Sequence, residues 1–153
     1  MIIDTDTGPI TLGYIGPNLI CEFGIRTIDK QPSRKLVRQF QQYFQGRFKK
    51  AFDAPLATGA PFMQKCWVAC RKIPYGETMT YGELAKEAGS PKAARAAGQA
   101  MRNNPTAIIT PCHRVIASSG KLHGFSGKTD PISKELQTKQ FLLSLEQSTT
   151  NCL

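Results

Sequence analysis

The hydrophobic pattern of the N-terminal part changes its period once. Short apolar runs at 10–15 and 19–23 are punctuated by Gly-Pro pairs, and they predict two or three short antiparallel strands joined by turns. From Ser33 to about Gly46 the apolar residues recur every three or four positions, which predicts a helix with Ser33 as its N-cap. Residues 49–60 show no period and predict a linker.

The pattern that follows the linker is helical. Pro61 suits the first position of a helix, and Thr80 and Glu83 match a capping box that opens a second, short helix. After a glycine turn, Ser90 is the expected N-cap of a further helix over 91–102. Two short helices across such a turn form a helix-turn-helix pattern, which occurs in DNA-binding domains and in other helical proteins.

Two more elements are predicted toward the C-terminus. The apolar residues 107–109 predict a short strand, and a final helix is predicted over 131–146 with Leu136, Gln140 and Leu143 on one side. Strands early in the chain and helices later predict an α+β fold.

Composition and net charge limit the classes of molecule that this chain is expected to bind. The 153 residues suffice for one domain or two small ones, and 41% hydrophobic with 20% charged residues indicates a folded chain. No apolar stretch approaches the roughly 20 residues that a membrane-spanning helix needs, so we expect no membrane span. Twenty Lys and Arg against eleven Asp and Glu give a net charge of +9, which favours a polyanion, nucleic acid first.

The helix predicted over 91–102 is built almost entirely of small residues, with cations at Lys92, Arg95 and Arg102. Such a smooth helix can pack tightly against another helix, or it can approach a nucleic-acid groove. In the second case Lys92 and Arg102 would meet phosphates, and Arg95 would project from the smooth face.

The five cysteines are an odd number without a Cys-x-x-Cys pair, and the chain has two histidines. A disulfide framework and a structural zinc site are therefore not expected, and we predict no metal. Cys112 differs from the others because His113 and Arg114 follow it, and neighbouring imidazole or guanidinium groups lower the pKa of a thiol. The remaining cysteines are expected in the core without a chemical role: Cys21, Cys66, Cys70 and Cys152.

At this point several motifs in order resemble those of the O6-alkylguanine-DNA alkyltransferase (methylated-DNA–protein-cysteine methyltransferase) family. They are Tyr81–Ala85, Ala93–Ala96, Met101–Pro105 and Pro111–Val115. The resemblance implies a small ribonuclease H-like domain with its linker over 1–60 and a mainly helical, winged-helix-like domain over 61–153. It also implies that no cofactor is needed.

The resemblance implies a single-turnover enzyme for DNA repair. Such an enzyme moves the alkyl group from O6 of a damaged guanine to its own cysteine, here Cys112, and O4-alkylthymine stays open as a second substrate. The family's histidine takes the thiol proton through a water and a glutamate supports it, which matches His113 and Glu146. Asn104 matches the asparagine that orders the active-site turn. Because the segment before the last helix is longer than usual, Glu135 is a rival for Glu146.

The implied partner is double-stranded DNA, bound through its minor groove with the damaged base flipped out. Tyr81 matches a tyrosine that crowds a phosphate, and Arg95 matches the arginine that fills the vacated stack. The full DNA-binding set is Tyr81, Ser90, Lys92, Arg95, Arg102 and Ser118. The base pocket is expected at Val115, Phe125 and Ser126, where Phe125 replaces a tyrosine of many members.

Two alternatives belong to other classes. An alkyltransferase-like protein recognises lesions without repairing them, but there the cysteine is replaced, whereas Cys112 is present. A Cys-dependent hydrolase would need an oxyanion hole and a group that orients the base, and it leaves Arg95 unexplained. The chain shows no pattern of a secretion signal, so we expect an intracellular protein, cytoplasmic in a bacterium or archaeon and nuclear in a eukaryote. We also expect it to be a monomer.

Overall fold

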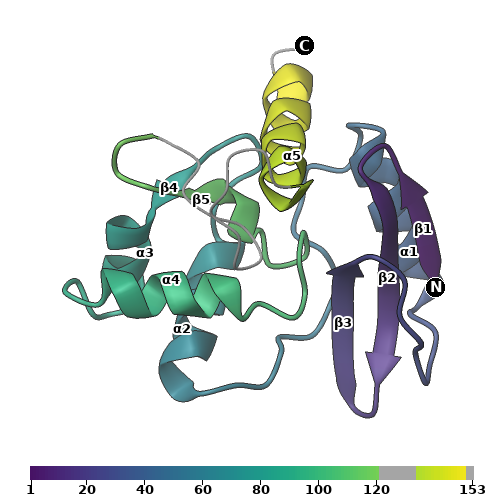
Figure 1. The fold of residues 1–153 in the computed structure, drawn as a ribbon, viewed down its shortest axis with the longest axis horizontal. Helices are drawn as coiled ribbons and strands as arrows, with labels where there is room; N and C mark the ends of the chain where they lie inside the picture. The colour runs from purple at the N-terminus through teal and green to yellow at the C-terminus, as the bar shows by residue number, and fades with distance from the viewer. Residues whose placement is uncertain (121–133, 151–153) are drawn as a thin grey trace.

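The structure is a computed structural model that describes residues 1–120 and 134–150, and it shows a mixed α/β fold (Figure 1). Strands β1 (Ile2–Thr5), β2 (Gly8–Ile15) and β3 (Asn18–Phe23) form an antiparallel sheet in the order β1-β2-β3. The predicted N-terminal strands are therefore confirmed.

Helix α1 (Arg34–Phe44) covers one face of this sheet. The Ser33 hydroxyl accepts the N–H of Leu36 at 3.1 Å, so the predicted N-cap is confirmed. The helix buries Leu36, Phe40 and Tyr43 in one cluster with residues of β2 and β3. It ends at Phe44, and two residues later Gly46 has a φ of 70°, a left-handed conformation that glycine adopts without strain.

The segment 49–60 has neither helix nor strand, as predicted, yet it is held in place. Phe52 is buried in the cluster beneath α1. The Arg71 guanidinium donates to the carbonyls of Ala54 and Pro55 at 2.9 and 2.8 Å. These bonds tie the linker to the helices that follow it.

Helices α2 (Pro61–Arg71), α3 (Tyr81–Glu87) and α4 (Ala94–Arg102) pack against one another. The capping box is confirmed, because the Thr80 hydroxyl accepts from the N–H of Glu83 at 3.1 Å and the Glu83 carboxylate accepts from the N–H of Thr80 at 2.8 Å. Strand β4 (Met79–Thr80), just before α3, pairs in parallel with β5 (Val115–Ile116).

Helix α4 begins later than predicted. Its first residue is Ala94 rather than Pro91, and Ser90 is not its cap. The reason is that Ser90 completes the end of α3: its N–H bonds to the carbonyl of Ala85 at 2.9 Å across Gly89, which has a φ of 89°. Its carbonyl then closes a turn to Ala93 at 2.9 Å.

The strand predicted over 107–109 is wrong. The chain pairs with β3 only at Thr106 and then folds back, with the N–H of Ile109 bonded to the carbonyl of Ala107 at 2.8 Å. This three-residue turn gives Ile108 a φ of 71°, a conformation that β-branched residues rarely adopt. Hydrogen bonds to distant segments, and not the strand preference of the apolar residues, determine the backbone conformation here.

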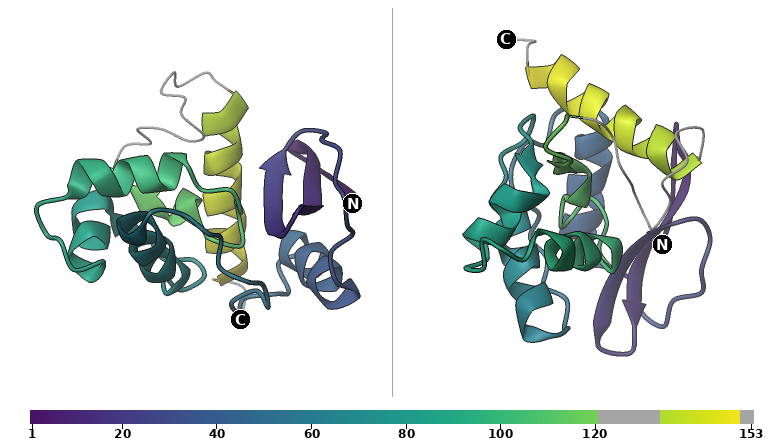
Figure 2. Two further views of the ribbon diagram at one scale, coloured as in Figure 1. Left: turned by 90° about the horizontal axis from the view of Figure 1, so that it is seen from below. Right: turned by 60° about the vertical axis from the view of Figure 1, so that its left-hand side comes forward.

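Helix α5 (Lys134–Thr150) lies between the α2–α4 helices and the sheet with α1 (Figures 1 and 2). Leu136 packs into the core of the helices, whereas Leu142 packs into the cluster under the sheet. The predicted face is partly wrong, because Gln140 is exposed and Leu143 half-buried. The predicted start at 131 lies outside the described residues. None of the helices within the described ranges has the length and apolar character that a membrane span requires.

Replacing Ser33 by alanine tests the cap of α1. The variant loses the acceptor for the N–H of Leu36, so we expect the free energy of unfolding to fall by about 1 kcal/mol in urea titrations followed by circular dichroism. Ser33→Asp keeps an acceptor and should remain close to the wild type. Equal losses in both variants would show that the capping bond does not stabilise the helix.

Candidate active site

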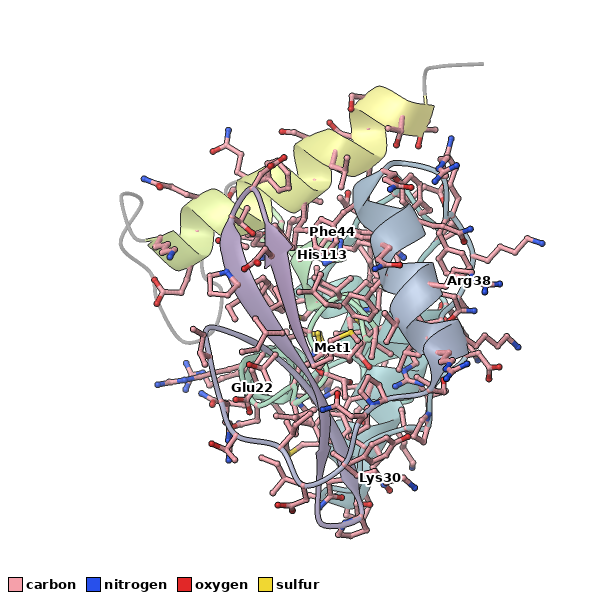
Figure 3. The ribbon with its side chains drawn as sticks, turned by 90° about the vertical axis from the view of Figure 1, so that its right-hand side faces the viewer. Met1, Glu22, Lys30, Arg38, Phe44 and His113 are labelled. Carbon is pink, nitrogen blue, oxygen red and sulfur yellow. The ribbon has the colours of Figure 1, made fainter. Side chains whose placement is uncertain are left out.

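Cys112 opens a single 3-10 turn, η1 (Cys112–Arg114), that contacts α5. The chain enters it through a three-residue turn at Pro111, where the N–H of Cys112 donates to the carbonyl of Thr110 at 2.7 Å. Cys112 is 7% exposed, and His113 lies fully buried in the interior beneath α5 (Figure 3). Little of the residue that carries the thiol is therefore open to solvent.

Asn104 closes the loop that leads to Cys112. Its Nδ2 donates to the carbonyl of Thr110 at 2.8 Å, and its Oδ1 accepts from the N–H of Thr106 at 3.1 Å. It also hydrogen-bonds to Cys112, which favours the thiolate. The side chain thus organises the turn that carries the thiol, while its part in catalysis stays a prediction.

The His113 ring is held in one orientation. Its Nε2 lies 2.7 Å from Oε1 of Glu146, and because a carboxylate accepts, Nε2 carries the hydrogen in the neutral ring. The other nitrogen, Nδ1, is then an acceptor, and it has no hydrogen-bond partner among the described residues. A buried basic nitrogen left open, on the residue that follows the thiol in the sequence, suits a proton acceptor.

Glu146 is fully buried at the centre of the network. Nε and Nη2 of Arg114 donate to its two oxygens at 2.9 Å each, and the N–H of Gly76 donates at 3.3 Å. The hydroxyl of Tyr43 donates to Oε1 at 2.7 Å. Burial alone would raise the pKa of Glu146, but His113 and Arg114 outweigh it and hold that pKa well below its usual range. Glu146 is therefore a carboxylate at neutral pH.

The thiol itself differs from the expectation. His113 and Arg114 are bonded to Glu146, and burial raises the pKa of the Cys112 thiol above its ordinary value, against the hydrogen bond from Asn104 and the charge of Lys139. The expectation of a lowered thiol pKa is wrong, because burial outweighs the groups that lower it, which include the backbone of His113. Cys112 rests as a protonated thiol and needs a base before it can attack.

Lys139 and Tyr43 belong to the site, and the sequence analysis missed both. Lys139 is 1% exposed, and its Nζ donates to the carbonyl of Val115 at 2.7 Å. It lies three residues after Leu136 and seven before Glu146, a helical spacing that indicates the buried face. Tyr43 lies on the apolar stripe of α1, and no sequence signal separates its hydroxyl from that of an ordinary core tyrosine.

The predicted DNA-binding residues lie on or near α3 and α4. Exposed side chains are those of Lys92, Arg95, Arg102 and Ser118, whereas Tyr81 and Ser90 are partly buried. Helix α4 buries Ala97 and Ala100 against its neighbours and turns its cations outward. Close packing of the small residues is confirmed, and contact of the outer face with DNA stays a prediction.

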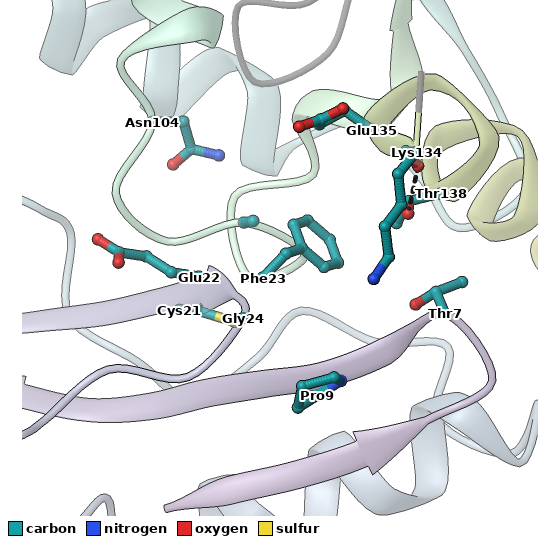
Figure 4. Close-up of a pocket in the computed structure, with 11 residues that line it drawn as sticks. Thr7, Pro9, Cys21, Glu22, Phe23, Gly24, Asn104, Lys134, Glu135 and Thr138 are labelled. Carbon is teal, nitrogen blue, oxygen red and sulfur yellow. Dashed lines mark hydrogen bonds between the residues drawn. The ribbon is translucent and has the colours of Figure 1, made fainter. Parts of the chain in front are cut away.

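Of the predicted base pocket, only Val115 can be described, and its side chain is fully buried. Phe125 and Ser126 lie outside the described residues. A separate cavity of about 420 Å³ lies between the end of β3 and the start of α5 (Figure 4). Asn104 lines it, but Cys112 and Val115 do not. Glu135, the rival of Glu146, also lines this cavity, whereas the carboxylate bonded to His113 belongs to Glu146.

Metal ligands do not cluster in the described part of the chain. Within 1–120 and 134–150, no three His, Cys, Asp or Glu side chains are placed to hold an ion. Cys21, Cys66 and Cys70 are free thiols in the interior, and burial raises the pKa of each.

Comparison with known proteins identifies the relatives of this chain. The family model described as "6-O-methylguanine DNA methyltransferase, DNA binding domain" matches residues 61–148, more than half of the 153 residues. The chain belongs to the 6-O-methylguanine DNA methyltransferase family. The matched segment contains the Cys112–His113–Glu146 constellation.

Other members of this methyltransferase family extend the match. A methylated-DNA–protein-cysteine methyltransferase of Methanosarcina acetivorans is 50% identical over 116 residues, which cover 75% of this chain and 69% of the relative. One of Mycobacterium bovis is 41% identical over 160 residues, 95% and 90% of the two chains. The crystal structure of Mycobacterium tuberculosis OGT in complex with DNA superposes with a TM-score of 0.79 at 41% identity, covering 97% and 92%. The methyltransferase fold therefore includes the N-terminal sheet and α1.

The buried lysine predicts a specific pH dependence of stability. Burial lowers the pKa of Lys139 from 10.5 to about 8, so between these values the unfolded chain binds more protons than the folded one. The contribution of Lys139 to the free energy of unfolding should consequently rise from pH 8 to 10, by up to about 3 kcal/mol, whereas the buried thiols with raised pKa values act in the opposite direction in both proteins. Urea titrations at several pH values, compared with Lys139→Met, measure this rise. Parallel curves for the two proteins would contradict it.

Proposed function

We propose that this methyltransferase repairs DNA by direct reversal, moving a methyl or larger alkyl group from O6 of guanine to Sγ of Cys112, once and irreversibly. One observation carries the assignment: a buried, protonated thiol lies next in sequence to an imidazole whose Nε2 is fixed by Glu146 and whose Nδ1 is open. Its relatives are named for methyl transfer from DNA to a protein cysteine.

The chemistry balances without a cofactor. The thiol proton passes to Nδ1 of His113 through a bridging water, and the charge of Lys139 favours the thiolate that remains. Sulfur then attacks the methyl carbon; the S–C bond forms as the C–O6 bond breaks, and the electron pair stays on guanine. Guanine takes up one proton and His113 gives up the one it accepted, so the thiol proton ends on guanine. The product is a thioether. Because a thioether is a poor leaving group, the protein is consumed in the reaction.

The DNA contacts complete the proposal. The damaged base would leave the stack through the minor groove and enter a pocket at Val115, Phe125 and Ser126, while Arg95 fills the gap. Tyr81, Ser90, Lys92, Arg102 and Ser118 would contact the backbone. We assign a ribonuclease H-like architecture to 1–60 and a winged-helix-like one to 61–153, and we infer an intracellular monomer.

Mass spectrometry tests the reaction directly. After incubation with a duplex that carries O6-methylguanine, we expect one methyl group per protein, on the Cys112 peptide. Cys112→Ala should gain none. Methyl on another cysteine, repeated turnover, or binding of the lesion without transfer would overturn the proposal.

Arg95→Ala tests base extrusion. Arg95 is exposed on α4. We expect transfer from duplex DNA to slow by about tenfold or more, because extrusion costs a few kcal/mol, and transfer from the free alkylated base to change little. Arg38→Ala removes the same charge from exposed α1 and serves as the matched control. Equal losses with duplex and free base would exclude the role in extrusion.

A further inference from the structure

A hydroxyl from α1 reaches the active site across the interior of the molecule. Oη of Tyr43 donates to Oε1 of Glu146 at 2.7 Å and lies 3.5 Å from Nε2 of His113. Tyr43 is 1% exposed, and burial together with Glu146 raises its pKa well above the ordinary value of 10. It is therefore a permanent hydrogen-bond donor.

The position of Tyr43 is fixed at both ends of its side chain. Its backbone lies in the last turn of α1, where its carbonyl accepts the N–H of Gly46 at 2.8 Å. A side chain at Gly46 would collide with Thr149 of α5, so this helix end sits directly on α5. The Tyr43 ring packs edge-on against Phe44 and Tyr75, with centroids 5.3 and 6.0 Å apart.

Oε1 of Glu146 is shared. His113 and Tyr43 both donate to it at 2.7 Å, whereas Arg114 bridges both oxygens. Donors that share one acceptor oxygen weaken each other, because each withdraws charge that the others would use. Tyr43 thus limits how strongly Glu146 can stabilise a protonated His113. Within the described residues, the ionisable groups that act on the His113 ring are Glu146 and Lys139 from α5, Arg114 from η1, and Tyr43 from α1.

We propose that Tyr43 is a positioning residue for methyl transfer: its hydroxyl fixes Oε1 of Glu146 against His113 and keeps the imidazole neutral, with Nδ1 open to the Cys112 proton. The inference rests on the proposed function. It gives the N-terminal sheet-and-helix unit a chemical task in the reaction.

Tyr43→Phe removes the hydroxyl and keeps the ring. We expect the pKa of His113 to rise, so the acid limb of the methyl-transfer rate moves up by about half to one pH unit, a threefold to tenfold loss of rate on that limb. The matched control is Tyr75→Phe, which loses a hydroxyl bonded to Thr149 at 2.6 Å in the same aromatic cluster and should not move the limb.

Nitrogen-15 NMR of the imidazoles measures the change in the pKa of His113 directly and without DNA. The chain has two histidines, so His123→Gln leaves one spin system to titrate. The wild type should show hydrogen on Nε2 and none on Nδ1, and Tyr43→Phe should titrate at higher pH. Coincident His113 titrations for the wild type and Tyr43→Phe would overturn the inference, whereas a wild type that does not methylate Cys112 would overturn the proposed function.

A second variant guards against misfolding of Tyr43→Phe. Site-specific 3-fluorotyrosine at position 43 keeps the hydroxyl and makes it a stronger donor. The acid limb and the His113 titration should then move to lower pH, opposite to Tyr43→Phe. A shift in the same direction as Tyr43→Phe, or none, would contradict the role of the hydrogen bond.

Discussion

A carboxylate with no access to water holds the active site of this protein together. Removing a charged group from water costs several kcal/mol, and only complete pairing offsets the cost. Glu146 meets this condition with donors from Arg114, His113, Tyr43 and Gly76. Because these donors come from separate segments, each segment must be in place before the ion is satisfied.

The same constraint explains the role of α5. One face of the helix packs Leu136 into the core of α2–α4, and Leu142 into the cluster beneath the sheet. Glu146, on the same helix, accepts hydrogen bonds from His113 of η1 and from Tyr43 of α1, and so connects these two elements. The two cores therefore share an element whose buried face carries both apolar residues and the charged groups of the site, Lys139 and Glu146.

The sequence alone predicted the starts of α1 and α3, which depend on hydrogen bonds between neighbouring residues. Ser33 and the Thr80–Glu83 pair satisfy backbone groups within three residues, so their motifs mark helix starts correctly. The order of Cys112 and His113 likewise pointed to the site. The prediction from the sequence failed where contacts between distant residues determine the structure. The strand predicted over 107–109 is an example: Asn104 donates to the carbonyl of Thr110, and the chain between them forms turns. The protonation state of Cys112 depends on burial and on Lys139, which no neighbour in sequence reveals.

The burial of Cys112 has a consequence for the protein between reactions. Oxidants and soft electrophiles attack the thiolate, not the thiol, and they require access to sulfur. A thiol that is 7% exposed and has a raised pKa is a poor target for both. A protein that can react only once must survive intact until its substrate arrives. The same desolvation that makes a base necessary for the reaction thus protects the sulfur until the substrate arrives.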